Sequence, residues 1–284
     1  SAAAGARALE RGGAPRDRSG LLAHSAVCRD FMEPATASVV HARLELAPQC
    51  AAWDLSNACL GFANAMVVAA GAIERGELEA ALVVAGEDGR PLVDATIAHL
   101  LQRAERGEVT RDDVKLAYAS LTIGSGGAAA VLAREDLARP DATRLVGGVG
   151  LAATEHNELC RGDRVEGAEG PLMETDSERL MHAGNELAQR TFALLLETLD
   201  WRREDIERVV THQVGSAHRR LLFETLGLEV ARDFPTLATC GNIGSVSLPL
   251  SLSLARDAGF VAPGARTALL GIGSGLQSVM LGLA

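Results

Sequence analysis

The chain is poor in aromatic residues, in basic charge and in long apolar runs, and each shortage excludes a class of protein. Aromatic side chains make up 3% of the 284 residues, so aliphatic side chains must fill the core. The formal net charge is −10 and no basic stripe occurs, which argues against a surface that binds nucleic acid. The longest apolar run, residues 58–73, is too short to span a bilayer, and we expect it to form a fully buried helix.

Paired cysteines are also missing. The chain has an odd number of cysteines and no C-x-x-C motif; they are Cys28, Cys50, Cys59, Cys160 and Cys240. A disulfide framework and a zinc site are therefore not expected, and a reducing cytoplasm suits the chain better. Any one of these cysteines is by default a small buried side chain, unless its context indicates otherwise.

Short aliphatic runs alternate with helical patterns, which predicts an α/β fold. Strands are expected at residues 21–27, 51–55, 81–85, 126–133, 144–151, 208–211, 267–272 and 278–283. Helices are expected from Pro34, from Cys59, over residues 178–199 and after Asn242.

The order of these elements repeats. Cys59 and Asn242 each precede an apolar helix and lie 183 positions apart, and two pairs of strands show offsets of 186 and 188. Near-constant offsets indicate a duplicated unit, with halves at residues 1–142 and 143–284. The first half lacks the opening strand and part of the first helix. We therefore expect the native polypeptide to extend before Ser1 by roughly 50 to 90 residues, because a missing strand would leave a sheet edge exposed.

Cys59 is the strongest candidate nucleophile. It follows a predicted strand and a short polar turn and stands where an apolar helix begins. A helix N-terminus favours a thiolate through its dipole and free N–H groups, so we expect an activated cysteine here.

Three polar residues are further candidates, and each also has an ordinary structural interpretation. His212 ends a predicted strand, where α/β sheets bind ligands, but it also fits a loop histidine. Asn242 stands between glycines in Gly241-Asn242-Ile243-Gly244 and fits a helix cap equally well. Glu33 precedes Pro34 and, taken alone, is better explained as a carboxylate that complements a helix dipole. The other histidines are expected to be solvated or structural.

A glycine-rich segment, Gly271-Ile272-Gly273-Ser274-Gly275, lies between two strands and precedes no helix. A dinucleotide-binding loop requires strand, glycines and then helix, so we reject that interpretation. The backbone N–H groups of Cys59, Gly273 and Ser274 are candidates for stabilising an oxyanion.

The order Cys59, His212, Asn242 on a duplicated α/β unit resembles the ketoacyl synthase III branch of the thiolase superfamily. The resemblance covers residues 20–283 and rests on Ser56-Asn57-Ala58-Cys59, His212-Gln213-Val214, Gly241-Asn242-Ile243-Gly244 and Gly271-Ile272-Gly273-Ser274-Gly275-Leu276. It implies a thiolase fold, in which two βαβαβ halves form an α-β-α-β-α sandwich, and an acyltransferase with Cys59, His212 and Asn242 as catalytic residues.

Within that branch the segment Arg29-Asp30-Phe31-Met32-Glu33-Pro34 is similar to the OleA-type enzymes of long-chain olefin and β-lactone biosynthesis. That similarity implies a non-decarboxylative Claisen condensation of two fatty acyl-CoA thioesters. It also implies that Glu33 is catalytic and crosses a dimer interface into the partner's site. The alternative is decarboxylative condensation with a malonyl thioester, which needs no base.

The resemblance also implies the partners. We expect acyl-CoA substrates, no cofactor beyond the coenzyme A that they carry, no metal and no nucleic acid. A homodimer is expected, or a heterodimer with a related subunit, and downstream lipid-modifying enzymes could act on the product. Residues 162–177 look longer than usual in this branch and are expected to form a disordered or pocket-covering loop.

Two other classes of protein remain in view. Cysteine, histidine and asparagine also follow this order in papain-like hydrolases, but the duplicated architecture and the absence of a cysteine-tryptophan signature argue against them. A non-catalytic subunit of a heterodimer is the third possibility, and the complete set of Cys59, His212 and Asn242 argues against it.

Overall fold

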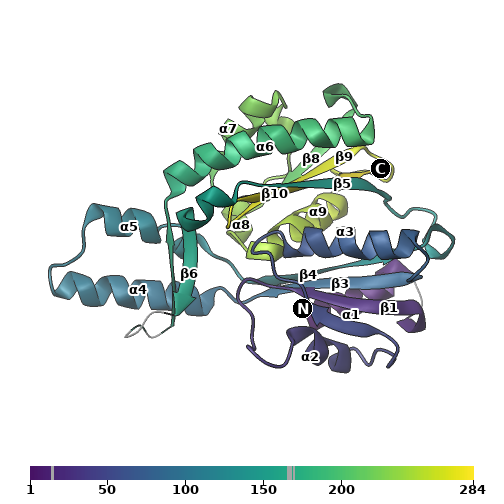
Figure 1. Cartoon of the computed structure of the whole chain (residues 1–284), viewed down its shortest axis with the longest axis horizontal. Coiled ribbons are helices and arrows are strands. Elements are labelled where there is room, and N and C mark those ends of the chain that lie inside the picture. Colours follow the sequence, from purple (N-terminus) through teal and green to yellow (C-terminus); the bar gives the residue numbers. More distant parts are fainter. Residues whose placement is uncertain (14–15, 165–167, 169) are drawn as a thin grey trace.

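The structure is a computed structural model that describes residues 1–13, 16–164, 168 and 170–284 (Figure 1). Its strands are β1 (Ser19–Ser25), β2 (Ala51–Asp54), β3 (Ala80–Glu87), β4 (Gly126–Ala133), β5 (Leu145–Ala152), β6 (Cys160–Arg164), β7 (Pro171–Thr175), β8 (Arg208–Thr211), β9 (Thr267–Gly273) and β10 (Gln277–Leu283). Its α-helices are α1 (Ala2–Gly12), α2 (Thr36–Arg43), α3 (Gly61–Glu74), α4 (Arg90–Glu105), α5 (Arg111–Ala117), α6 (Ser177–Leu199), α7 (Ser216–Leu226), α8 (Leu237–Cys240) and α9 (Ser247–Asp257). None of these helices has the length and hydropathy needed to cross a membrane.

Two four-stranded sheets share a common arrangement of three strands. The first has the order β2-β1-β3-β4, with β4 antiparallel to its neighbour β3 and the other pairs parallel. The second has the order β5-β10-β9-β8, in which β8 and β9 are parallel and β10 is antiparallel to both its neighbours. Strands β1, β3 and β4 thus correspond to β8, β9 and β10, which confirms the predicted duplication.

The two sheets differ at both edges. In the first sheet β2 flanks β1, whereas no strand among the described residues flanks β8 in the second. In the second sheet β5 flanks β10, whereas no strand in the described part of the chain pairs with the outer edge of β4. The boundary that we predict at residues 142–143 falls between β4 and β5.

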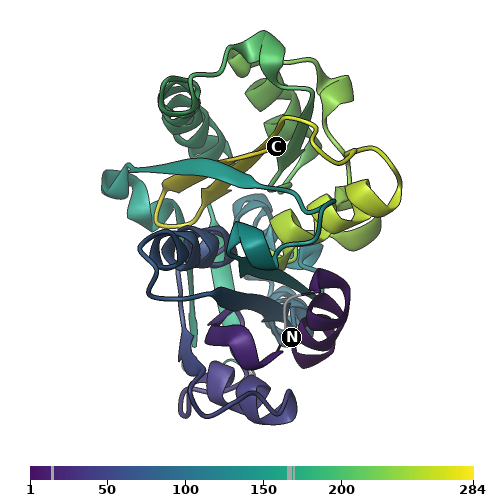
Figure 2. The ribbon, with the colours of Figure 1, turned by 90° about the vertical axis from the view of Figure 1, so that its right-hand side faces the viewer.

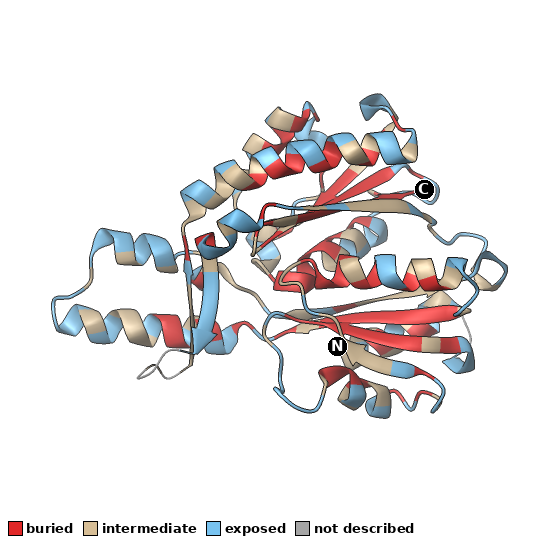
Figure 3. Ribbon diagram, in the orientation of Figure 1, coloured by how far each residue is buried: buried red, intermediate tan, exposed pale blue. Residues whose placement is uncertain are grey.

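The elements stack in five layers, as the thiolase fold predicts (Figure 2). Helices α1 and α2 cover the outer face of the first sheet, and α3 and α9 lie between the two sheets. Helices α6 and α7 cover the outer face of the second sheet. Strand β3 is buried over almost its whole length, because helices cover both of its faces, and this accounts for its continuous apolar sequence (Figure 3).

The expectation that the helix after Cys59 is fully buried is wrong on one side. Ala65 and Ala69 are completely buried in the central core, but Val67 is 40% and Val68 46% exposed. The second sheet covers only part of α3, so an apolar stripe of this helix faces outward in the single chain.

A small substructure, which the sequence did not predict, projects from the end of the sheets. Helices α4 and α5 leave β3 and pack against a hairpin formed by β6 and β7 (Figure 1, left). The Ser120 hydroxyl donates to the Met173 carbonyl oxygen at 2.9 Å and ties the connection after α5 to this hairpin. The loop that we expect at residues 162–177 is therefore largely an ordered hairpin and the start of α6; residues 165–167 and 169 lie outside the described residues.

Candidate active site

Cys59 lies on a tight turn between β2 and α3. Ala58 has φ of +44°, a conformation that costs a non-glycine residue energy and occurs at functional sites. Gly61 allows the turn, because a Cβ there would collide with the Ser25 hydroxyl and lie 2.9 Å from the Leu55 carbonyl oxygen. The Asn57 amide braces the turn by donating to the Asn64 side-chain oxygen at 2.8 Å.

His212 is the first residue after β8. Its backbone N–H donates to the Leu270 carbonyl oxygen at 2.9 Å and extends the pairing with β9 by one residue. Both ring nitrogens are buried without a hydrogen-bond partner in the described structure. Such unpaired atoms are costly, so a substrate group that bonds to them would be stabilised here.

The neighbouring Gln213 holds the loop that follows. Its side-chain oxygen accepts hydrogen bonds from the backbone N–H groups of Thr236 (2.9 Å) and Leu237 (3.1 Å). Its amide nitrogen donates to the Phe234 carbonyl oxygen at 2.8 Å. Gln213 thus fixes the segment that leads into α8 and on to Asn242.

Asn242 is fixed through its main chain. Its N–H donates to the Thr122 carbonyl oxygen at 2.9 Å, and its carbonyl oxygen accepts from the Gly124 N–H at 2.8 Å. The side-chain oxygen accepts from the Gly244 N–H at 3.0 Å, which sets the orientation of the amide. Gly241 (φ +71°) and Gly244 (φ +51°) supply the left-handed conformations that this loop needs.

Gly273 ends β9 directly behind the Cys59 turn. A Cβ at this position would lie 2.9 Å from the Leu60 side chain and 3.7 Å from the Cys59 nitrogen, so glycine permits the close approach. Ser274 follows in the turn to β10, and its hydroxyl donates to the Cys160 sulfur at 3.4 Å. The segment 271–275 is thus the end of a strand and a hairpin turn, which agrees with our rejection of a dinucleotide loop.

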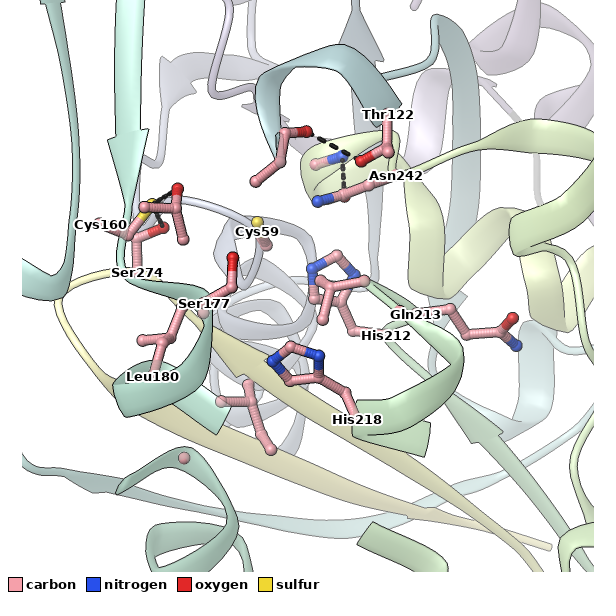
Figure 4. A pocket seen from close by; sticks show the side chains of 18 of the residues that line it. Cys59, Thr122, Cys160, Ser177, Leu180, His212, Gln213, His218, Asn242 and Ser274 are labelled. Carbon is pink, nitrogen blue, oxygen red and sulfur yellow. Dashed lines mark hydrogen bonds between the residues drawn. The ribbon is translucent and has the colours of Figure 1, made fainter. Parts of the chain in front are cut away.

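One cavity brings these residues together. Cys59, His212, Asn242, Gly273 and Ser274 all line it, and in Figure 4 the first three surround one space. Most of the remaining wall is apolar and includes Leu92, Ile123, Met173, Leu180, Met181, Leu222 and Ile272. An apolar cavity with few convergent polar groups suits a substrate with a hydrocarbon chain.

Burial keeps both titratable groups uncharged, which differs from our expectation of a thiolate. Desolvation, with a smaller contribution from the Glu87 carboxylate, raises the pKa of Cys59 to about 12. Desolvation, with a smaller contribution from nearby His218, lowers the pKa of His212 to about 4. Burial in this apolar cavity therefore leaves a neutral thiol and a neutral imidazole at rest.

Glu33 does not join the other candidates. It is exposed on the loop between β1 and α2 and is absent from the lining of this chain's cavity. Its neighbours Phe31 and Met32 are also exposed, Met32 at 95%. The structure therefore places Glu33 at the surface and outside the cavity that Cys59 lines.

The sequence analysis gave no site role to several residues that line the cavity, among them His218, Cys160 and Glu87. His218, expected to be solvated or structural, lines the wall, and its Nε2 has no partner in the described structure. Cys160, at the start of β6, accepts hydrogen bonds from Thr175 and Ser274 at 3.4 Å each. Glu87 ends β3 and is 7% exposed. An acidic residue that closes a buried apolar strand was a visible signal for Glu87.

Among the described residues no cluster of three or more histidine, cysteine or acidic side chains could hold a metal ion.

Comparison with protein families places the chain in a class. Residues 53–145 match the family described as 3-oxoacyl-[acyl-carrier-protein] synthase III, and residues 196–282 match the C-terminal family of the same enzymes. The fold and these matches define a thiolase-fold condensing enzyme, which is an acyltransferase.

Individual relatives narrow this class. The chain is 40% identical to an acyl-CoA:acyl-CoA alkyltransferase of Xanthomonas campestris over 93% of the chain and 75% of that protein. It is 36% identical to the protein of the same name from Shewanella oneidensis, over 93% of the chain and 76% of that protein. The chain belongs to this alkyltransferase family, the OleA family.

Solved structures agree. Cerulenin-bound OleA of Xanthomonas campestris matches with a TM-score of 0.90 at 38% identity, over 100% of this chain and 80% of that one. A 3-oxoacyl-(acyl carrier protein) synthase III from Xanthomonas oryzae matches with a TM-score of 0.89 at 38% identity, also over 100% and 80%.

Proposed function

We propose that this enzyme joins two fatty acyl-CoA thioesters by a non-decarboxylative Claisen condensation and releases a β-ketoacyl thioester. The observation that carries the proposal is the apolar cavity in which Cys59, a neutral His212 and Asn242 converge. The names of the relatives supply the substrate class, since they describe transfer between two acyl-CoA molecules.

The first half-reaction loads Cys59. His212 accepts the thiol proton while the sulfur attacks the acyl-CoA carbonyl carbon, and the coenzyme A thiolate leaves with that proton. The backbone N–H groups of Cys59 and of the Gly273–Ser274 segment stabilise the oxyanion. A pKa of about 12 makes a standing thiolate rare, so proton transfer to His212 accompanies the attack.

The second half-reaction forms the carbon–carbon bond. The carbonyl of a second acyl-CoA accepts hydrogen bonds from His212 and Asn242, which acidifies its α-carbon. A carboxylate, Glu33 from a second subunit, takes the α-proton, and the resulting enolate attacks the Cys59 thioester. The Cys59 sulfur leaves and regains a proton, so two acyl-CoA molecules give one β-ketoacyl-CoA and one free coenzyme A.

A homodimer is part of this proposal. The loop with Glu33 exposes Val27, Phe31 and Met32, and α3 exposes Val67 and Val68, so apolar surface lies on both elements. A second copy of the chain that covers this surface would receive Glu33 at its own cavity.

Coenzyme A enters only as part of the substrates. We place the enzyme in the cytoplasm, which suits five free cysteines, and expect lipid-modifying enzymes to act on the product.

Decarboxylative condensation is the second candidate, because the matched family models describe 3-oxoacyl-carrier-protein synthases. A malonyl donor generates its carbanion by losing carbon dioxide and would leave Glu33 without a role.

Intact-mass spectrometry with a panel of acyl-CoA molecules tests the first half-reaction. We expect one acyl group per chain in the wild type and none in Cys59→Ala, with loading retained in the matched variant Cys160→Ala. Turnover is then followed with acyl-CoA alone and with added malonyl-CoA, while carbon dioxide is measured. A β-ketoacyl product formed from acyl-CoA alone supports the proposal; a strict need for malonyl-CoA, or an acyl group on Cys59→Ala, contradicts it.

A further inference from the structure

Glu87 stands where the two halves of the molecule meet beside Cys59. Its carboxylate is 7% exposed and lines the catalytic cavity at the end of β3. No arginine, lysine or histidine of the described residues forms an ion pair with it. A buried carboxylate without a cation is costly unless several hydrogen bonds stabilise its charge.

Four donors meet this carboxylate. The Val27 and Cys28 N–H groups donate to its two oxygens at 2.8 Å each. Ser245 donates twice to Oε1, from its backbone N–H at 3.0 Å and from its hydroxyl at 2.6 Å. Two donors thus come from the loop after β1, and two come from the second half of the chain.

The first pair of donors begins the loop that carries Glu33. Strand β1 ends at Ser25, and Val27 and Cys28 open the connection to α2 in which Glu33 is exposed. Anchoring of these two N–H groups sets the direction in which the loop leaves the sheet.

The second pair of donors belongs to the loop of Asn242. Ser245 is completely buried three residues after Asn242. Gly244 lies between them, donates to the Asn242 side chain, and has no room for a Cβ, which would lie 2.6 Å from the Glu87 carboxylate. The carboxylate therefore packs directly against the turn that orients the Asn242 amide.

We propose that Glu87 is a positioning residue for the condensation half-reaction, because its carboxylate joins the loop that carries Glu33 to the loop that orients Asn242. This rests on the proposed function, in which Asn242 serves the chain's own site and Glu33 serves the partner's. Loading of Cys59 uses neither group, so loss of Glu87 separates the two half-reactions.

The test compares Glu87→Gln with Glu87→Asp, Ser245→Ala and the control Glu79→Gln. Glutamine keeps the size but turns an NH₂ group toward backbone donors, whereas aspartate keeps the charge. Glu79 immediately precedes β3, and its carboxylate pairs with Arg18 at the surface. The readouts are Cys59 loading by intact mass, the condensation rate, and exchange of the substrate α-proton with deuterated water.

We expect Glu87→Gln to load Cys59 to the wild-type extent and to lose condensation and α-proton exchange by roughly tenfold to a hundredfold, the effect of misplacing a catalytic group by about 1 Å. Glu87→Asp should retain more activity than Glu87→Gln, Ser245→Ala should lie between Glu87→Gln and wild type, and Glu79→Gln should match wild type. If Glu87→Gln does not fold, Glu87→Asp and Ser245→Ala provide the test. Both should show reduced condensation while Cys59 is still loaded. Wild-type condensation in the folded variants, or equal loss of loading and condensation, overturns the proposal.

Failure of the proposed function is distinguishable, because it appears in the wild type. A wild-type enzyme that requires malonyl-CoA refutes the non-decarboxylative reaction. In that case the condensation rates of the variants are compared with malonyl-CoA as the donor. Glu87 is then expected to act only through the position of Asn242. A wild-type condensation rate in Glu87→Gln would again contradict the positioning role of Glu87.

Discussion

His212 and Cys59 illustrate how burial sets the chemistry of individual residues in this cavity. In water a histidine is partly protonated slightly below neutral pH, and a cysteine is partly deprotonated above it. In this cavity the apolar environment keeps both side chains neutral. A neutral imidazole can accept the thiol proton in one half-reaction and donate a hydrogen bond to a carbonyl in the other. The same environment links the charge state of His212 to the stability of the fold.

We predict that His212 makes the protein less stable in acid. In the unfolded chain its imidazole takes up a proton below the ordinary pKa of 6.5, whereas in the folded protein it does so only near 4. Stability is therefore greatest above pH 6.5 and falls as the pH drops toward 4. Between pH 7.5 and 4.5 the unfolding free energy of wild type should fall by roughly 2 to 3 kcal/mol more than that of His212→Asn.

Urea unfolding at the two pH values measures this difference. His182→Asn, on the exposed face of α6, is the control and should follow wild type. Equal losses in wild type and His212→Asn would show that His212 is not held neutral by folding.

At the scale of elements, the turn that presents Cys59 depends on how closely α3 approaches β1. The first residue of α3, Gly61, lies against Ser25, and the helix then runs through the central layer between both sheets. Gly71 lies in the same helix but is partly exposed, and a Cβ there would meet only the flexible end of Arg75, at 3.3 Å. The two glycines therefore differ in what a methyl group would do.

Gly61→Ala should destabilise the protein by roughly 1 to 3 kcal/mol, because a methyl group forces α3 away from β1. It should also slow the loading of Cys59, since the turn moves with the helix. Gly71→Ala should leave loading unchanged and stabilise the helix by about 0.5 to 1 kcal/mol. Thermal unfolding and loading rates measure both effects, and a Gly61→Ala protein with wild-type values for both would contradict the proposed packing constraint.

At the scale of the whole molecule, one chain holds Cys59, the proposed nucleophile, together with His212 and Asn242 in a cavity but presents Glu33 at the surface. The exposed apolar residues on the Glu33 loop and on α3 suit a second copy of the chain. A two-fold dimer would then contain two sites, each with Cys59 from one chain and Glu33 from the other.

Mixed dimers test this arrangement. We expect Cys59→Ala and Glu33→Ala each to be inactive alone and to regain activity when co-expressed with two different tags. Random pairing makes about half of the dimers mixed, and one of the two sites in each is intact, so about a quarter of all sites should work. Purified mixed dimers that show no condensation would reject a shared site, as would Cys59→Ala dimers that are active alone.

The sequence by itself predicted most of the regular structure. All the expected strands occur, and β4 and β8 have the expected bounds, because each aliphatic run forms a continuous pair with its neighbouring strand. Helices α4, α5, α7 and α8 and the hairpin β6–β7 were not predicted. Helices α4 and α5 are mostly exposed, so their sequence has no strong apolar period. The expectation of a fully buried α3 failed because composition does not tell which face a neighbouring layer covers.

The sequence also placed Cys59, His212, Asn242, Gly273 and Ser274 at the ends of strands and the starts of helices, where a duplicated α/β unit brings residues together. Only the tertiary structure decided that burial keeps Cys59 and His212 uncharged, that Glu33 lies outside its own cavity, and that Glu87 connects the two halves. Each of these depends on contacts between segments far apart in the chain, such as the 158 positions between Glu87 and Ser245. Local patterns carry no information about such contacts, because desolvation and hydrogen bonding are set by whatever the fold packs alongside.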